Sequence, residues 1–280
     1  SFILPMPIWG PFRAAARLCA GLTWSLGCYF VLLALNICYL LSPEQARTRK
    51  KAWARRWIRG VATILGLRIT TYGHVPEKPY FLVNNHITWL DFLAMNSLLD
   101  ARFVVMAELA TTPIVGAFIK AMEAIPTRRL SEDTSQVLEA MVTTLQTGNN
   151  LTMAPEGVIS PGREVRRFRA SLFRAAIAAH FPVHYASITY VTPEGCPKAS
   201  ERVLFGPDPH YPWPDGKIPA GELEGWGTQR TFFGHLIRLL ALPWYECVVR
   251  FEPTPVYAED PIELANLLQQ GVQRIFVPIQ

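Results

Sequence analysis

A histidine and an aspartate stand five positions apart (91 − 86) in the stretch VNNHITWLDF, as His86 and Asp91. On one continuous helix, five steps of about 100° would turn the two side chains roughly 140° apart, so they would not meet. They meet if His86 lies in a strand-to-helix turn and Asp91 in the first helical turn. The imidazole then donates one ring N–H to the carboxylate, and the other nitrogen can act as a base. The alternative is a turn histidine and a helix-start carboxylate that share no task.

A second polar turn occurs in the stretch MAPEGVISPG, where Glu156 and Gly157 follow a short apolar run. A turn at the carboxyl end of a strand is a common place for a site in an α/β sheet. Glu156 can accept a hydrogen bond from a substrate hydroxyl, and Gly157 permits close approach to the backbone. An ordinary surface turn is the alternative.

Arginines supply the third chemical signal. Arg128 and Arg129 end the stretch EAIPTRR and suit bidentate binding of a phosphate, although a solvated surface pair fits the sequence equally well. A second basic group is expected to be mostly a solvated helix face with one or two headgroup contacts. Its members are Arg163, Arg166, Arg167, Arg169 and Arg174.

The elements that must position these residues alternate along the chain. Strands are expected at Tyr80–Val83, Arg102–Met106, Leu151–Met153, His184–Tyr190 and Cys247–Phe251, and helices at Ser131–Gln146 and Leu172–Ala179. Pro207–Pro219 is expected to be a loop. This alternation predicts an α/β domain over residues 68–280, with a mixed, largely buried sheet flanked by helices.

Residues 1–67 are predicted to form a separate membrane-attachment module of two helices. Leu22–Leu41 is apolar and long enough, at roughly 30 Å, to cross a bilayer. A helix that lies within one leaflet is equally compatible, and a cleaved signal peptide is disfavoured by the basic sequence that follows. The second helix, Arg47–Leu67, repeats Trp53 and Trp57 at helical spacing, which suits an interfacial helix. A helix packed on its own domain is the alternative.

The net charge of +5 is local, because seven basic residues lie between positions 47 and 59 and leave 20 basic against 22 acidic residues elsewhere (27 − 7 = 20). This basic run is Arg47, Arg49, Lys50, Lys51, Arg55, Arg56 and Arg59. Its place directly after an apolar segment favours anionic lipid headgroups over nucleic acid. If the first helix spans, the basic run places the domain on the cytoplasmic side of an inner or cytoplasmic membrane.

Several classes of chemistry have no support in the sequence. The five cysteines are widely spaced without a CxxC pair, so neither a disulfide framework nor a zinc site is expected. Neither GxxxxGK[ST] nor GxGxxG occurs, which disfavours a nucleotide enzyme. The nucleophile elbow GxSxG is also missing, which disfavours a serine hydrolase.

The order of the polar segments resembles the glycerolipid acyltransferase family typified by bacterial 1-acylglycerol-3-phosphate acyltransferases. That family has four ordered blocks, and the resemblance runs from about Trp53 to about Arg274. The matching residues are His86 and Asp91 for the His-x4-Asp block, Arg129 or Arg128 for the second, Glu156 and Gly157 for the third, and Pro182 for the fourth.

The resemblance implies transfer of a fatty acyl group from acyl-CoA or acyl carrier protein to the hydroxyl of a lysolipid. On this resemblance, 1-acyl-sn-glycerol-3-phosphate is the first acceptor to expect. No cofactor or metal is expected beyond the thioester co-substrate. His86 would be the general base and Asp91 would orient it. Arg128 and Arg129 would hold an acidic headgroup, and Glu156 would orient the acceptor.

The third block departs from the family pattern. It commonly reads Glu-Gly-Thr-Arg-Ser, whereas Glu156 and Gly157 are followed here by Val158, Ile159 and Ser160. An arginine expected to help hold phosphate is therefore missing. The pattern is also similar to relatives that acylate other lysolipids, including lyso-ornithine lipids and lysophospholipids with larger headgroups. A lipid or thioester hydrolase and a non-catalytic lipid-binding protein stay open as further alternatives.

Overall fold

The computed structural model describes residues 6–127, 135–205 and 231–280 of the chain. These residues form a seven-stranded sheet in the order β1-β7-β6-β2-β5-β3-β4. Only β6 and β7 run antiparallel, and every other neighbouring pair is parallel. The strands are β1 Leu67–Tyr72, β2 Phe81–Asn84, β3 Arg102–Met106, β4 Ile125–Thr127, β5 Leu151–Met153, β6 Val183–Val191 and β7 Tyr245–Phe251. The predicted α/β class with a mixed sheet is confirmed.

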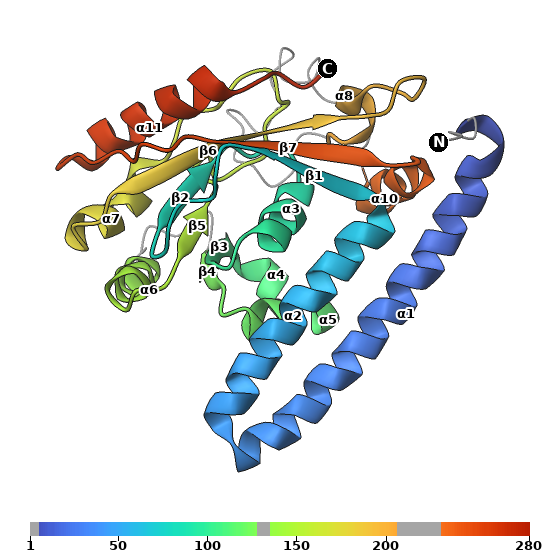
Figure 1. Cartoon of the computed structure of the whole chain (residues 1–280), viewed down its shortest axis with the longest axis horizontal. Coiled ribbons are helices and arrows are strands. Elements are labelled where there is room, and N and C mark those ends of the chain that lie inside the picture. The colour runs from blue at the N-terminus through green and yellow to red at the C-terminus, as the bar shows by residue number, and fades with distance from the viewer. Residues whose placement is uncertain (1–5, 128–134, 206–230) are drawn as a thin grey trace, which may run out of the picture.

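Helices lie on both sides of this sheet, with α11 on one face and α1, α2 and α3 toward the other (Figure 1). The long helices are α1 Met6–Leu41, α2 Pro43–Leu65, α6 Ser135–Gln146, α10 Phe232–Ala241 and α11 Pro261–Ile275. The short ones are α3 Leu90–Leu98, α4 Ala107–Thr111, α5 Pro113–Ala121, α7 Arg174–Ala178, α8 Ala199–Arg202 and the 3-10 turn η1 Ala170–Phe173. The expected loop Pro207–Pro219 lies outside the described residues.

The two strands that the sequence does not predict, β1 and β4, are the two edges of the sheet. Strand β1 has only one buried residue in six, and β4 contains Pro126. Proline is tolerated at a sheet edge because one side of an edge strand needs no ladder hydrogen bond. Half-exposed edge strands show no continuous apolar run, whereas the inner strands β2 and β5 are buried at every position.

The two N-terminal helices form an antiparallel hairpin (Figure 1). Indole groups hold the helices together: Trp24 donates to the carbonyl of Trp57 at 3.0 Å, and Trp53 donates to that of Cys28 at 3.1 Å. Helix α2 ends at Gly66, whose left-handed backbone (φ 81°) reverses the chain into β1. The hairpin therefore runs straight into the sheet without a linker.

The hairpin also packs against the rest of the chain. The ring of Trp57 stacks on Phe118 of α5 with centroids 3.9 Å apart. Arg17 donates to the carbonyls of Leu242 and Pro243 just after α10, at 2.6 and 2.8 Å. A cation at the carboxyl end of a helix satisfies carbonyls that have no partner within it. The division into residues 1–67 and 68–280 stays a prediction.

The basic run of α2 is largely used inside the molecule. Arg55 and Lys51 pair with Asp100, at 2.6 and 3.8 Å, and Arg47 pairs with Glu123. Burial alone would raise the pKa of Asp100 and of Glu123. The paired cations outweigh burial, so the pKa of each acid is lowered. Of the remaining basic residues, Arg49, Arg56 and Arg59 are exposed. Part of the run therefore holds the hairpin to the rest of the chain, and its contacts with lipid headgroups stay a prediction.

Two glycines test how closely the hairpin is packed. A Cβ on Gly60 of α2 would lie 2.2 Å from the indole nitrogen of Trp24, whereas a Cβ on Gly27 of α1 would meet nothing within 4 Å. We expect Gly60→Ala to lower the free energy of unfolding by about 1–3 kcal/mol through overpacking. Gly27→Ala should raise it by up to about 1 kcal/mol through helix propensity. Denaturant unfolding of both variants in detergent checks this, and equal effects would refute close packing at Gly60.

Candidate active site

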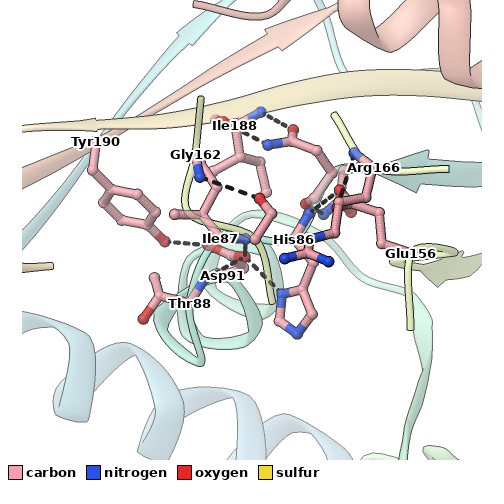
Figure 2. A network of polar contacts seen from close by, with 12 residues as sticks. His86, Ile87, Thr88, Asp91, Glu156, Gly162, Arg166, Ile188 and Tyr190 are labelled. Atoms are coloured by element: carbon pink, nitrogen blue, oxygen red, sulfur yellow. Dashed lines mark hydrogen bonds and ion pairs between the residues drawn. The ribbon is translucent and has the colours of Figure 1, made fainter. Parts of the chain in front are cut away.

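His86 lies in the turn between β2 and α3, and Asp91 lies in the first turn of α3. His86 Nδ1 and Asp91 Oδ2 are 2.8 Å apart. Figure 2 draws this contact as a dashed line. The contact that the spacing allowed is therefore present. With Nδ1 donating to the carboxylate, Nε2 presents its lone pair on the other side of the ring. The side chain of His86 is 23% exposed, so this nitrogen can be reached.

The carboxylate of Asp91 is buried and held from several directions. Its Oδ2 accepts the backbone N–H groups of Ile87 at 2.7 Å and Thr88 at 3.1 Å, besides the imidazole. Its Oδ1 accepts the hydroxyl of Tyr190 on β6 at 2.7 Å. A buried carboxylate keeps its charge when such donors replace its water. The acid that faces His86 is thus fixed in place.

Glu156 follows β5 and joins the His86 turn to a distant segment. Its Oε1 accepts the backbone N–H of His86 at 2.7 Å, and its Oε2 accepts that of Arg166 at 3.2 Å. Burial raises the pKa of Glu156 to about 8, although both backbone donors favour the charged form. Both carboxyl oxygens are already engaged, so the geometry gives Glu156 the task of holding His86. Its expected role in orienting the acceptor stays a prediction.

Further backbone bonds fix the turn around His86. The carbonyl of His86 accepts the N–H of Ser160 at 2.8 Å. Asn85 exchanges two hydrogen bonds with the backbone of Ile188 on β6, at 2.9 and 2.6 Å (Figure 2). The turn is thereby attached to β6 as well as to the segment after β5. A turn held in this way keeps the imidazole in one orientation.

Gly157 allows a side chain to cross the turn. Its φ is +71°, and a Cβ there would lie 2.8 Å from Nε of Arg169. The group that approaches Gly157 closely is therefore the Arg169 guanidinium. Pro182, the proline of the fourth block, lies just before β6 and is exposed. Arg128 and Arg129 lie outside the described residues.

Two cavities meet at the Glu156–Gly157 turn. One, of about 840 Å³, is mostly apolar and includes His86, Asp91 and Gly157. Its walls come from the hairpin, α3, β3 and α10, among them Leu18, Leu22, Trp57, Val61, Phe103 and Leu236. The other, of about 730 Å³, includes Glu156 and four arginines: Arg163, Arg166, Arg167 and Arg169. Arg169 lines both cavities.

Three features of the site have no local sequence signal. Tyr190 stands 99 positions from Asp91, and Arg169 is one of five arginines in a basic stretch. His235 of α10 accepts the Trp89 indole N–H at 3.1 Å and fixes the turn next to Asp91. Burial lowers the pKa of His235 to about 4, so its ring is neutral and can accept that bond.

Among the described residues, no cluster of metal-ligating side chains forms a metal site.

Comparisons with known proteins show which proteins the chain is similar to. Residues 66–191 match the family model described as Acyltransferase. The lyso-ornithine lipid O-acyltransferase of Pseudomonas aeruginosa is 25% identical over 81% of this chain and 78% of its own length. That of Rhizobium meliloti is 28% identical over 58% of each chain. The 1-acyl-sn-glycerol-3-phosphate acyltransferase of Neisseria meningitidis is 29% identical over 49% of this chain and 55% of its own. The matches to the last two relatives thus span little more than half of their length.

A solved structure supports the fold. The 1-acyl-sn-glycerophosphate acyltransferase of Thermotoga maritima superposes with a TM-score of 0.53 over 92% of this chain and 97% of that one, at 17% identity. The matched residues 66–191 contain the His86 turn, the Glu156 turn and strand β6. Residues 66–191 therefore match an acyltransferase family model, and the chain is similar to lysolipid acyltransferases.

Proposed function

We propose that the chain transfers a fatty acyl group from a thioester, acyl-CoA or acyl carrier protein, to the free hydroxyl of a lysolipid. The observation that carries this proposal is the His86–Asp91 pair on the wall of an apolar cavity. The names of the relatives support a lysolipid acceptor. A 1-acyl-sn-glycerol-3-phosphate and a lyso-ornithine lipid are the two acceptors to test first.

The reaction needs a base because a hydroxyl is a poor nucleophile at neutral pH. His86 Nε2 removes the proton of the acceptor hydroxyl while its oxygen attacks the thioester carbonyl. Asp91 stabilises the imidazolium that forms. The tetrahedral intermediate then expels the thiolate, and the imidazolium gives its proton to that leaving group. The products are an ester and a free thiol. General-base catalysis of this kind typically contributes about 10²–10⁴-fold.

The apolar cavity suits the fatty chains of both substrates. Leu18, Leu22 and Val61 of the hairpin supply part of its wall, next to the same space that His86 faces. Apolar walls favour fatty chains, because each methylene removed from water contributes about 0.8 kcal/mol. They also keep water away from the thioester, which favours transfer over hydrolysis.

We further propose that Arg169 holds the anionic group of the acceptor. Its guanidinium crosses Gly157 and lines both the apolar cavity and the arginine-rich cavity. A lipid whose hydroxyl is at His86 can therefore place a phosphate or carboxylate at Arg169. The residue at position 159, where the family pattern carries an arginine, is Ile159 and lines the apolar cavity. An apolar side chain there favours a lyso-ornithine lipid, whose acidic group is a carboxylate, as the second candidate acceptor.

The hairpin is proposed to attach the protein to the membrane surface rather than to cross the bilayer. Trp9–Ile37 of α1 has a mean hydropathy of 1.9 and is long and apolar enough to span. However, the middle of α1 is bonded to α2 beside Arg55 and Arg56, through Trp53 and Trp57. A spanning α1 would carry those charges into hydrocarbon, which is costly. One face of α1 stays exposed and apolar: Leu22, Leu26, Phe30, Leu33 and Ile37.

The base is tested by His86→Ala. Lysolipid-dependent release of free thiol from acyl-CoA should fall by about 10²–10⁴-fold, the range for loss of a general base. The exposed His74 supplies the matched control, and His74→Ala should keep the wild-type rate. A folded His86→Ala variant with a near-wild-type rate would refute this mechanism. Thiol release without any lysolipid would instead indicate a hydrolase.

The headgroup contact is tested by Arg169→Gln. The KM for the acidic lysolipid should rise by about tenfold, because one charge-assisted hydrogen bond is lost, whereas the KM for acyl-CoA should not change. Arg174→Gln, at an exposed position of α7 outside both cavities, is the control. A rise in the KM for acyl-CoA alone would assign Arg169 to the thioester donor instead.

Membrane attachment is tested by charges on the apolar face of α1. Phe30 and Ile37 are 65% and 67% exposed, and their joint change to Asp should reduce co-sedimentation with anionic liposomes by at least about tenfold. The control pair, Ile262→Asp with Leu267→Asp, lies on α11 across the sheet (Figure 1) and should bind as wild type does. Alkaline carbonate should extract the wild-type protein from membranes, and resistance to extraction would indicate a spanning helix.

A further inference from the structure

Tyr190 lies on β6, on the side of Asp91 that faces away from His86 (Figure 2). Its hydroxyl donates to Asp91 Oδ1 at 2.7 Å, and its ring is 1% exposed. The imidazole and both backbone donors all contact Oδ2. Within the described part of the chain, Tyr190 is therefore the single donor to the second carboxylate oxygen.

The strand partner of Tyr190 completes its surroundings. Cys247 lies directly opposite in the antiparallel register of β6 and β7, and its buried thiol contacts the hydroxyl. Burial raises the pKa of Tyr190 well above its usual value, and the charge of Asp91 adds to the shift. The phenol therefore stays protonated, and its one hydrogen is directed at the carboxylate. A phenylalanine would fill the same space without this bond.

We infer that Tyr190 is a positioning residue for acyl transfer, which acts on His86 through Asp91. This inference rests on the proposed function of the His86–Asp91 pair. A carboxylate bonded through one oxygen alone can turn about its Cβ–Cγ bond. The hydroxyl on the other oxygen stops that rotation, so Oδ2 stays aligned with His86 Nδ1. The hydroxyl also draws negative charge toward Oδ1, which weakens the attraction of Asp91 for a proton on the imidazole.

Tyr190→Phe removes only the hydroxyl. We expect kcat to fall by about tenfold, as for one lost hydrogen bond to a charged group, with the KM of both substrates unchanged. The acid limb of kcat against pH should move to higher pH by about half a unit, because the carboxylate then holds the imidazolium more strongly. A merely structural change would move neither the pH profile nor kcat at constant KM.

Tyr185→Phe is the matched control. Tyr185 lies on the same strand and is buried, and its hydroxyl accepts one hydrogen bond from Arg274 Nη2 at 2.7 Å. It should lose comparable stability in thermal unfolding and keep the wild-type kcat and pH profile. Site-specific 3-fluorotyrosine at position 190 keeps the ring and hydroxyl, so it should fold even if Tyr190→Phe does not. Its stronger donor should move the acid limb to lower pH.

The outcomes separate the two proposals. A wild-type protein without lysolipid-dependent thiol release would refute the proposed function itself. An active wild type whose kcat and acid limb are the same in Tyr190→Phe would overturn the inference alone. The inference also fails if Tyr185→Phe reproduces both changes, or if fluorotyrosine at position 190 leaves the acid limb in place.

Discussion

The site depends on the hydrogen bonds that hold one buried carboxylate, that of Asp91. Asp91 is 4% exposed at its side chain, and an ionised acid without partners in such a place is very costly. Four donors remove that cost: one imidazole, two backbone N–H groups of its own turn, and Tyr190 from β6. The turn between Asn84 of β2 and Leu90 of α3 supplies two of them, because the N–H groups of Ile87 and Thr88 point at Asp91 Oδ2. The fourth requires that β6 lie next to β2, which is the central pairing of the sheet.

Glu156 extends this constraint to a third segment. By accepting the amides of both His86 and Arg166, it fixes the distance between the base and the arginine-rich segment. Burial raises its pKa to about 8, so its environment disfavours the charged form. Two acids in one site thus have different surroundings. Asp91, which accepts more hydrogen bonds, contacts the imidazole of His86. Glu156, which accepts fewer, connects two loops through their backbone N–H groups.

The hairpin combines two tasks that appear separate in the sequence. Its inner face forms part of the wall of the cavity that His86 faces, and its outer face exposes apolar side chains such as Phe30. If α1 lies on the membrane as proposed, a lipid that leaves the membrane along this helix reaches His86 without crossing open water. The ion pairs from α2 to Asp100 and Glu123 hold that wall against the sheet. Basic residues that suggest headgroup binding in the sequence thereby acquire a structural role.

The sequence by itself predicted the α/β class and the inner strands, placed two helices in the first 67 residues although the first begins earlier than expected, at Met6, and allowed the His86–Asp91 contact. Each depends on local information: apolar runs for buried strands, helical periodicity, and a spacing that a strand-to-helix turn satisfies. Only the tertiary structure decided that Tyr190 contacts Asp91, that Arg169 lines the same cavity as the pair, and that Glu156 accepts the backbone N–H of His86. Those contacts join residues 70 to 99 positions apart, and the order of strands in the sheet, which no local pattern encodes, brings them together. The edge strands β1 and β4 went unpredicted for a related reason, since half-exposed strands gain their pairing from neighbours rather than from an apolar pattern.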